Sequence, residues 1–541
     1  MTKGRAVSDV SAGGTFYEAA LTAASLNPRT KEPEIQGCEE PLHVVHITAE
    51  MAPMAKVGGL GDVVHGLARA CHLKGHDVEV ILPGYSCVSD SPVWEDTQDE
   101  GYFDCTYRGG TVGVRVVTAR VHGVRVVRLI PQGVNYFQGG RIYGGGYNEM
   151  EAYLFFCRAA LEWLLQAGRR PQAIHLHDWH TAACSFLYWE EYYGRGLNSA
   201  RLCLTIHNLD HTGECRQDEL SWTGLDGASF ATMDRALDPR TIGHNPERLS
   251  LLKGGIVFCN SVVTVSPTYR QETLQGGAYM NKTLQDKGGR YLGVLNGIDV
   301  DEWNPAEDRL FHAAQEMAKS TVPFNFDASN VAGKKALQAY VRAQLGLRPS
   351  EGPLVICVTR LVPQKGAHLI RHAIFRTIEK GGQFVLLGSG HLSPEFERLQ
   401  QNELRDSPDA KIFLFYSDPL SHFLYGAADM CLVPSMFEPC GLTQMISMRY
   451  GSIPVVRRTG GLADTVRDVN ETADWDPPSN GFVFDGADER SLDSALDRAI
   501  DMFTMDPKGW TNLMKNAMEE NFSWGPSADA YINLYRENMR L

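Results

Sequence analysis

At 541 residues the chain is too long for one hydrophobic core, so we expect at least two domains. Hydrophobic residues make up 43% and charged residues 21% of the chain, as in ordinary globular proteins, and the net charge of -14 argues against a nucleic-acid partner. Twelve cysteines without a Cys-x-x-Cys pair favour free thiols in a reducing compartment, and no apolar run reaches the roughly 20 residues that cross a bilayer.

Residues 1–40 mix small, polar and charged residues without a sustained period, and we predict a disordered tail or linker. A transit peptide would be rich in arginine and poor in acids, whereas this segment carries Glu18, Glu32, Glu34, Glu39 and Glu40. The segment is compatible with the remnant of a longer precursor.

The first globular part begins with a strand over 42–48, a glycine loop, a helix over 63–73 and a second strand over 77–83. This order is typical of a Rossmann-like βαβ unit. Gly58 and Gly59 allow the backbone to approach a diphosphate, and Lys56 supplies a positive charge. The alternative is a structural turn with a solvated lysine. A dinucleotide site is disfavoured because the Gly-x-Gly-x-x-Gly fingerprint is missing. Residues 101–130 alternate as strands and predict a hairpin near the sheet edge.

Histidines gather at the end of the strand that starts at Ala173. The run His175-Leu-His177-Asp178-Trp-His180 resembles the His-x-His-x-Asp-His pattern of two-metal hydrolases, but its aspartate stands one place early. We therefore expect no metal here and interpret these groups as polar side chains that line the cleft or bond in the core. The strand over 201–206 then ends in His207 and Asn208, at the same carboxyl edge.

Residues 213–250 are irregular and predict a lid or acceptor-contacting insertion that carries Trp222 and Phe230. A strand is predicted over 256–265, and a further strand and turn contain Asn296. We place the hinge just after Asp299, which gives a tail of 1–40, an N-terminal domain of 41–300, a C-terminal domain of 301–521 and a final helix of 522–541.

The second half repeats the strand-loop-helix order without obvious sequence identity to the first. Most of these strands end in glycine, a basic residue or an acid, at Arg360, Lys365, Gly388, Glu438 and Gly460, and the strand over 411–415 leads into Tyr416. Glu438 stands at the end of a buried strand, just before a helix that opens at Gly441-Leu442-Thr443. A carboxylate beside helix N-terminal amides indicates a nucleotide-sugar site. The alternative is that Glu438 caps the helix.

The motifs together resemble those of the starch synthase and bacterial glycogen synthase family. The resemblance spans 42–541 and rests on Lys56-Val-Gly-Gly-Leu-Gly-Asp62, His207-Asn208, Arg360 with Gln364-Lys-Gly366, Phe437-Glu-Pro-Cys-Gly-Leu-Thr-Gln444 and Thr459-Gly-Gly-Leu-Ala-Asp-Thr465. Val57 is similar to the residue of plant and algal class III and IV starch synthases. Many wider relatives carry a second glutamate eight positions after the one that matches Glu438, and Ile446 stands there instead.

The resemblance implies an α/β protein of two Rossmann-like domains facing across a cleft, the GT-B glycosyltransferase fold, with the C-terminal helix crossing back to the first domain. It implies retaining transfer of glucose from ADP-glucose to the non-reducing 4-hydroxyl of an α-1,4-glucan, without a metal or other cofactor. The implied partners are ADP-glucose, ADP and a malto-oligosaccharide or glucan, with no nucleic acid or membrane. The implied location is the plastid stroma for a plant or algal chain and the cytoplasm otherwise.

Within that reading, the catalytic residues are Glu438, Lys365, Arg360, His207 and Lys56. The cations and the amides of Gly58, Gly59, Leu442 and Thr443 hold the diphosphate, Glu438 orients glucose, His207 contacts the sugar and Tyr416 stacks on adenine. Glu50 and Asp62 position Lys56 or the acceptor, and Asn208, Asn296, Gly388, Cys440 and Gly441 complete the substrate-binding set. Three alternatives stay open: Asp178 as a nucleophile in a double displacement, Tyr416 as a core residue, and Cys440 as a reactive or an inert thiol.

Two rival functions remain at this point. One is a glucan-binding or granule-initiation scaffold of low activity on the same fold. The other is a retaining transferase that uses UDP-glucose or a non-glucan acceptor. A dehydrogenase is disfavoured, because the full glycine fingerprint and its ribose-binding acid are missing.

Overall fold

The computed structural model describes residues 16, 34–88, 94–276, 279–471 and 478–540. The chain divides into two compact units, an N-terminal unit of Lys31–Gly297 with Trp524–Leu541 and a C-terminal unit of Ile298–Ser523, with which Phe16 is grouped. Most of the predicted tail, 1–40, lies outside the described residues. Phe16 is an exception, because it is buried and its ring centroid lies 4.7 Å from that of Phe423.

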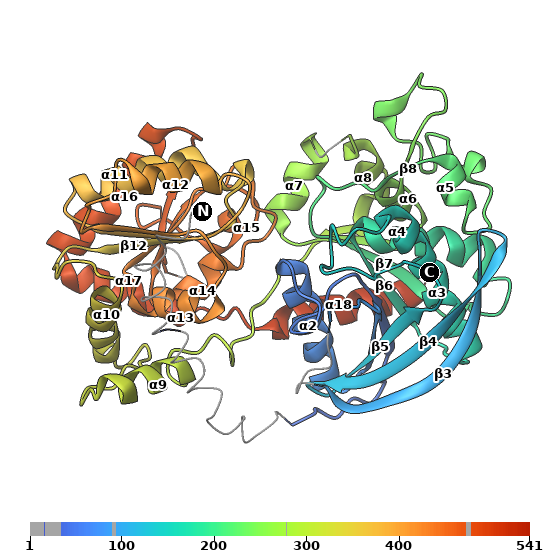
Figure 1. The fold of residues 1–541 in the computed structure, drawn as a ribbon, viewed down its shortest axis with the longest axis horizontal. Coiled ribbons are helices and arrows are strands. Elements are labelled where there is room, and N and C mark those ends of the chain that lie inside the picture. Colours follow the sequence, from blue (N-terminus) through green and yellow to red (C-terminus); the bar gives the residue numbers. More distant parts are fainter. Residues whose placement is uncertain (1–15, 17–33, 89–93, 277–278, 472–477, 541) are drawn as a thin grey trace, which may run out of the picture. The chain divides into compact units, whose positions relative to one another are not determined.

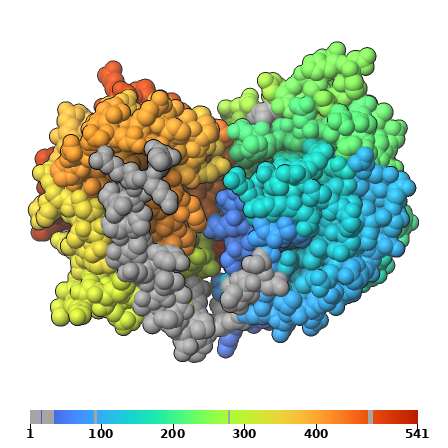
Figure 2. All heavy atoms as spheres, in the orientation of Figure 1, coloured from blue at the N-terminus to red at the C-terminus, as the bar shows by residue number. Residues whose placement is uncertain are grey.

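In the described part of the N-terminal unit, nine strands form one sheet, in the order β11-β10-β7-β6-β1-β2-β5-β4-β3 (Figure 1). Neighbours from β11 to β5 are parallel, whereas β4 and β3 are added antiparallel at one edge, which confirms the predicted hairpin. The β3–β5 segment (blue) forms part of the visible surface of this unit (Figure 2). The strands are β1 (His43–Ile47), β2 (Asp77–Pro83), β3 (Glu95–Tyr107), β4 (Gly110–Val121), β5 (Val124–Pro131), β6 (Ala173–His177), β7 (Arg201–Ile206), β10 (Ser261–Thr264) and β11 (Tyr291–Gly293), with the separate pair β8 (Glu214–Cys215) and β9 (Leu249–Ser250).

Helices cover both faces of this sheet, because its strands alternate two sets of buried side chains. On β1, Val45 and Ile47 join the core beneath α3 and α4, whereas Val44 joins the core beneath α2 and α18. The helices are α2 (Gly59–Leu73), α3 (Glu149–Gln166), α4 (Asp178–Leu187), α5 (Gln217–Ser221), α6 (Leu251–Phe258), α7 (Pro267–Gly276), α8 (Asn281–Lys287) and α18 (Trp524–Met539), with short turns η1 (Tyr188–Tyr192), η2 (Gly227–Phe230), η3 (Pro239–Thr241) and η4 (Gly288–Arg290).

The last helix, α18, returns to the N-terminal unit, as predicted. The Tyr535 hydroxyl lies 2.7 Å from Nδ1 of His175 on β6, and the Asn538 amide donates to Ser261 Oγ on β10 at 2.7 Å. The C-terminal segment therefore completes the covering of a sheet built almost entirely from the first half of the sequence.

Among the described residues of the C-terminal unit, six parallel strands form one sheet, in the order β14-β13-β12-β15-β16-β17. The chain moves outward from β12 to β14 and then returns to place β15 beside β12, which makes a topological switch point between these two strands. The strands are β12 (Leu354–Val358), β13 (Gln383–Leu387), β14 (Ala410–Phe413), β15 (Met430–Val433), β16 (Ile453–Arg457) and β17 (Phe482–Phe484). The helices are α9 (Arg309–Ala318), α10 (Ala332–Gln344), η5 (Pro363–Lys365), α11 (Ala367–Glu379), α12 (Ser393–Gln401), α13 (Asp418–Ala427), α14 (Thr443–Arg449), α15 (Gly460–Thr465), α16 (Glu489–Met505) and α17 (Pro507–Met518).

One predicted boundary is wrong. Ile256–Phe258 complete α6, and β10 begins only at Ser261, because a short buried apolar run does not distinguish a helix end from a strand. In the described part of the chain, no helix combines the length and the apolar character that crossing a membrane requires.

Candidate functional site

The central pair of the C-terminal unit is Lys365 and Glu438. Lys365 ends the loop after β12 and Glu438 stands in the loop after β15, so both leave the same edge of the sheet at the switch point. Lys365 Nζ lies 2.5 Å from Glu438 Oε2, and Ser435 Oγ donates to the same oxygen at 2.7 Å. The two side chains are 15% and 10% exposed. The predicted cation and carboxylate are therefore held together in one partly buried site.

Two glycines allow the loops to meet around Glu438. Gly366 has φ +70, and a Cβ there would lie 2.2 Å from the Pro434 carbonyl oxygen. Gly460 has φ +43, and its Cβ would lie 2.0 Å from the carbonyl oxygen of Glu438. Since neither contact tolerates a side chain, glycine at these positions brings the loops after β12 and β16 against the loop after β15.

The remaining predicted residues of this unit follow neighbouring strand ends. Arg360 is exposed just after β12. Gly388 follows β13, where a Cβ would lie 1.9 Å from the Thr359 carbonyl oxygen. Gly441 has φ +76, and Leu442 and Thr443 begin α14. This edge of the sheet thus gathers cationic side chains and close-approaching backbone, which suits a phosphorylated ligand.

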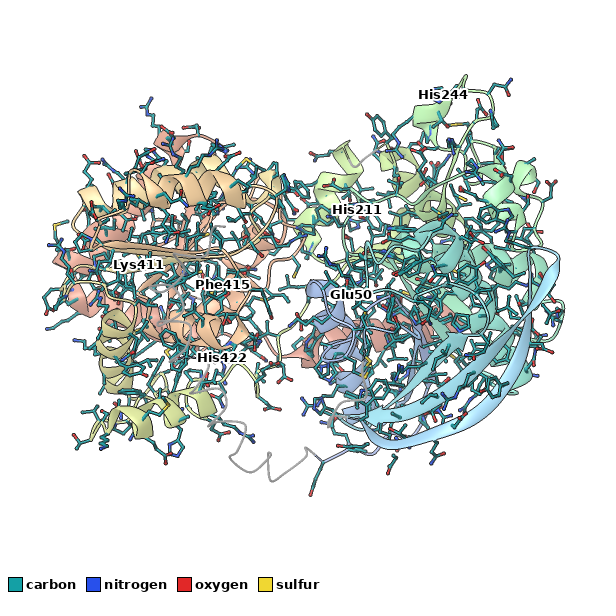
Figure 3. The ribbon with its side chains drawn as sticks, viewed as in Figure 1. Glu50, His211, His244, Lys411, Phe415 and His422 are labelled. Carbon is teal, nitrogen blue, oxygen red and sulfur yellow. The ribbon has the colours of Figure 1, made fainter. Side chains whose placement is uncertain are left out.

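The exposure of Tyr416 and of Cys440 bears on two alternatives that the sequence left open, a core tyrosine and a reactive thiol. Tyr416 follows Phe415, which is labelled in Figure 3, and it is 74% exposed, so it is not a core residue. Its hydroxyl donates to Asp418 Oδ1 at 3.3 Å. Cys440 is 6% exposed, and its carbonyl oxygen would lie 2.0 Å from a Cβ at Gly461, so the inert packing alternative fits better than a reactive thiol.

In the N-terminal unit, Lys56 is positioned by Asp62. Its Nζ lies 2.8 Å from Asp62 Oδ1, and each side chain is 33% exposed. Asp62 stands in the first turn of α2, which begins at Gly59, so its carboxylate also complements the positive end of that helix. Lys56 is thereby held at a helix N-terminus and remains partly accessible.

Glu50, labelled in Figure 3, organises the glycine loop from beneath. Its Oε2 accepts hydrogen bonds from the amides of Val57 at 2.7 Å and Gly58 at 3.0 Å, and its Oε1 accepts from the Tyr143 hydroxyl at 2.8 Å. This corrects one prediction: the Gly58 amide points at Glu50 rather than at a diphosphate. The sequence did not predict Tyr143, because 93 residues separate it from Glu50.

Asp178 shapes the loop after β7. Its Oδ1 accepts a hydrogen bond from the His207 amide at 2.7 Å. Burial raises the pKa of Asp178 to about 7, although hydrogen bonds from the amides of His207 and Asn208 partly oppose this shift. Asp178 has φ +54, a left-handed conformation that aspartate tolerates better than most residues. A carboxylate engaged by backbone amides is poorly placed to act as a nucleophile.

His207 and Asn296 are two further residues of this unit that the sequence assigns to the substrate. His207 Nε2 lies 3.0 Å from His177 Nδ1, and burial lowers the pKa of His207 to about 3, so its ring is neutral. Asn296 is 5% exposed and its Oδ1 has no hydrogen-bond partner among the described residues. Asn208 Oδ1 accepts from the Asp210 amide at 3.0 Å, which is a local turn contact.

The histidine run does not form the two-metal arrangement. Asp178 bonds to backbone amides, and His180 stacks on Trp179 with ring centroids 4.2 Å apart. His175 and His177 instead lie beside His46 of β1, and the three offer nitrogens within 4.8 Å of one another. The sequence could not reveal this group, because the position of β1 beside β6 is a property of the fold.

Two aromatic residues of the region 213–250 pack on the core of the N-terminal unit. Phe230 is buried and stacks on Phe186 with ring centroids 5.2 Å apart. The guanidinium of Arg108 lies 4.6 Å from the ring centre of Trp222, whose side chain packs on the same core. Phe230 therefore supports the unit's own core and Trp222 is partly buried against it, whereas contact between this insertion and an acceptor stays a prediction.

Family models match most of the chain. Residues 43–286 match the model described as starch synthase catalytic domain, and residues 343–512 match the model of glycosyl transferases group 1. The chain is 45% identical over 510 residues to probable starch synthase 4, chloroplastic/amyloplastic, of Arabidopsis thaliana, covering 92% of this chain but 47% of that protein. It is 40% identical over 501 residues to glycogen synthase of Protochlamydia amoebophila, covering 92% of this chain and 99% of that one.

Solved structures agree with these matches. The catalytic domain of starch synthase IV from Arabidopsis thaliana, bound to ADP and acarbose, superposes with a TM-score of 0.86 at 44% identity, covering 93% of this chain and 100% of that one. Sucrose-phosphate synthase from Thermosynechococcus elongatus shares the fold, with a TM-score of 0.57 at 18% identity over 92% of this chain and 98% of that one.

Proposed function

Since this chain belongs to the family of starch synthases and bacterial glycogen synthases, and is therefore a glycosyltransferase, we propose that it transfers glucose from ADP-glucose to the non-reducing 4-hydroxyl of an α-1,4-glucan. The observation that carries the proposal is the Lys365–Glu438 pair at the switch point of the C-terminal unit. A cation beside a carboxylate matches a sugar diphosphate, which presents phosphate oxygens next to sugar hydroxyls. The starch synthase IV relative was solved with ADP and acarbose.

Breaking the bond between the anomeric carbon and phosphate places negative charge on ADP. Arg360 and Lys365 stabilise that charge, and a preorganised donor of this kind contributes on the order of 10² to 10³ in rate. Glu438, fixed by Ser435 and Lys365, orients the glucose hydroxyls. Tyr416, exposed just after β14, offers its ring to adenine.

The N-terminal unit contributes Lys56 and His207 to the same reaction. Lys56, held by Asp62, adds positive charge for the diphosphate, and the neutral ring of His207 contacts the sugar. Asn296, whose buried Oδ1 has no hydrogen-bond partner among the described residues, is proposed to accept a hydrogen bond from a substrate hydroxyl. The proposal requires no metal, because these side chains supply the positive charge that the leaving group needs.

Retention of the anomer normally indicates a double displacement with a carboxylate nucleophile. Asp178 would be that carboxylate in this chain, but backbone amides engage it. We therefore favour front-face attack, in which the departing phosphate accepts the proton of the acceptor hydroxyl. The plant relatives are named chloroplastic/amyloplastic, so a plastid location is proposed for a plant or algal chain and the cytoplasm otherwise.

The test is incorporation of radiolabelled glucose into glycogen by the purified chain, with ADP-glucose and UDP-glucose assayed side by side. The proposal expects incorporation from ADP-glucose and at least about a hundredfold loss in Glu438→Gln. The exposed Lys508→Met variant serves as a control on α17. Glucan binding without incorporation would favour the scaffold, and a preference for UDP-glucose would favour the other transferase.

A further inference from the structure

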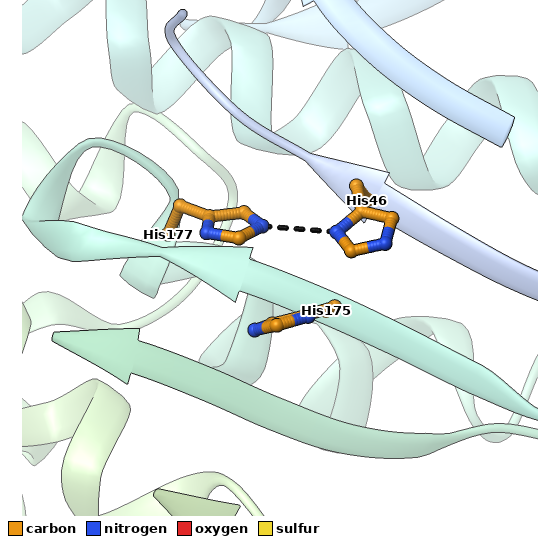
Figure 4. A group of neighbouring side chains, drawn as sticks. All are labelled: His46, His175 and His177. Carbon is orange, nitrogen blue, oxygen red and sulfur yellow. Dashed lines mark hydrogen bonds between the residues drawn. The ribbon is translucent and has the colours of Figure 1, made fainter. Parts of the chain in front are cut away.

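Three histidines form a hydrogen-bonded row that ends at His207. His46 on β1, His177 on β6 and His207 after β7 project from neighbouring parallel strands on one face of the sheet. His46 Nδ1 lies 3.1 Å from His177 Nε2, as the dashed line in Figure 4 shows, and His177 Nδ1 lies 3.0 Å from His207 Nε2. The row therefore connects the interior of the unit to a residue that we place against the substrate.

The row lies beneath α18 and is closed to water at its inner end. His46 and His177 are fully buried, and burial lowers the pKa of His46 to about 3 and that of His177 well below its usual value. Each imidazole is therefore neutral, with one nitrogen that donates and one that accepts. In a row of neutral rings, the tautomer of one ring determines the tautomer of the next.

The inner end of the row, at His46, determines in which direction the hydrogen bonds of the row are donated. His46 Nε2 is buried and has no hydrogen-bond partner among the described residues. A buried N–H without a partner is costlier and rarer than an unpartnered acceptor, so His46 Nε2 carries no proton. Its proton is then on Nδ1, which donates to His177 Nε2. His177 must in turn carry its proton on Nδ1, which donates to His207 Nε2.

We propose that His46 and His177 are positioning residues that hold His207 in the tautomer with its proton on Nδ1, so that this nitrogen donates to an oxygen of the bound sugar. The proposal rests on the proposed function, which brings the sugar to His207. Opposite tautomers along the row would turn Nδ1 of His207 into an acceptor. The row thus decides whether Nδ1 of His207 can donate a hydrogen bond to the substrate oxygen that it meets.

A metal site is the competing interpretation of the same group, since His46, His175 and His177 offer nitrogens close together. Both nitrogens of His175 are already engaged: Nδ1 lies 2.7 Å from the Tyr535 hydroxyl and Nε2 lies 2.7 Å from Thr205 Oγ1. An ion would have to displace one of these buried contacts. The geometry therefore favours the hydrogen-bonded row.

The experiment uses the full chain labelled with 15N-histidine and long-range proton–nitrogen correlation spectra, which distinguish a protonated from an unprotonated ring nitrogen. His207→Asn assigns the signals. The expected wild-type result, without any substrate, is a protonated Nδ1 and an unprotonated Nε2 on His207. A proton on Nε2 of His207 overturns the proposal, and so does one stoichiometric transition-metal ion in the purified protein.

Matched variants test the two positioning residues. Asparagine and leucine are nearly equal in size, but only asparagine can donate where Nδ1 of histidine stood. His177→Leu should release the His207 tautomer and lower kcat/KM about tenfold, the value of one hydrogen bond, whereas His177→Asn should retain both. His46→Leu and His46→Asn form a second pair, which is used if either His177 variant fails to fold. The loss of kcat/KM in His46→Leu should be smaller than that in His177→Leu. Equal tautomers and equal kcat/KM within both pairs overturn the proposal.

The spectra and the activity separate two failures. A His207 tautomer as expected in a chain that transfers no glucose would refute the proposed function and leave the row intact. Glucose transfer by a chain whose His207 carries its proton on Nε2 would refute the row and leave the proposed function intact.

Discussion

The Lys365–Glu438 pair provides the sharpest test, because it has a stabilising role and a catalytic role that can be separated. At the observed 2.5 Å, and with an effective dielectric constant of about 20, the attraction amounts to about 7 kcal/mol before desolvation. Desolvation offsets much of it, but removing one partner of a buried pair still costs about 3–5 kcal/mol, because the other charge is left unpaired. With side chains 15% and 10% exposed, the lower end of that range applies here.

We therefore expect Lys365→Met and Glu438→Gln each to lower the free energy of unfolding by about 3 kcal/mol, and the double variant to recover most of that loss. Activity should behave differently. Each single variant should lose at least about a hundredfold in turnover, and the double variant should not recover it, because neither the leaving-group cation nor the sugar-orienting carboxylate is present.

Urea unfolding of the four proteins gives the coupling free energy, and glucose incorporation from ADP-glucose gives the rates. A double variant that turned over glucose within about tenfold of wild type would refute the catalytic assignment. Strictly additive losses of stability would show that the pair makes no net contribution, which would refute the interpretation of the geometry.

Three further outcomes follow from single contacts. Burial raises the pKa of Asp178 to about 7, so between pH of about 4 and 7 the folded chain holds a proton that the unfolded chain has released. The free energy of unfolding therefore falls as pH rises through this range. Asp178→Asn should remove that pH dependence, measured by urea unfolding at a series of pH values. Burial by itself lowers the pKa of His422, but the Asp308 carboxylate 2.8 Å from its Nδ1, together with the charges of Asp418 and Glu302, raises the pKa above its usual value. His422→Gln should therefore abolish a stabilisation that is present below pH of about 6.5 and lost as pH rises through the folded pKa. Gly366→Ala should destabilise the chain by more than about 1 kcal/mol and disturb activity, since its Cβ would meet the Pro434 carbonyl, whereas Gly381→Ala, with φ +81 and open space, should show the backbone cost alone in thermal melts and normal turnover.

Much of the site was predictable because its residues stand at strand ends. In a parallel sheet, every strand that runs into a loop delivers that loop to one edge, so Arg360, Lys365, Gly388 and Glu438 were expected together before any pairing was known. Gly366 was expected only as part of the Gln364-Lys-Gly366 motif, and its close approach to the Pro434 carbonyl oxygen came from the structure.

Contacts between distant segments were not predictable. The assignment of the Gly58 amide to a diphosphate failed because Glu50 takes that amide, and the sequence did not show that the ring of Phe230 stacks on Phe186. In both cases, the sequence did not show which residue the group contacts. A hydrophobic or glycine pattern predicts that a residue is buried or turns, but it does not identify the neighbour.

By itself, the sequence determined the local order of strand, loop and helix, the chemistry available at each strand end and the family. Only the tertiary structure decided which of those ends meet. The placement of β15 beside β12 brings Glu438 to Lys365, 73 residues earlier, and the placement of β1 beside β6 aligns His46 with His177, 131 residues apart. The reason is physical: residue type and spacing control local conformation, whereas strand order depends on how all the helices cover both faces of a sheet, and that is settled only when the whole core is packed.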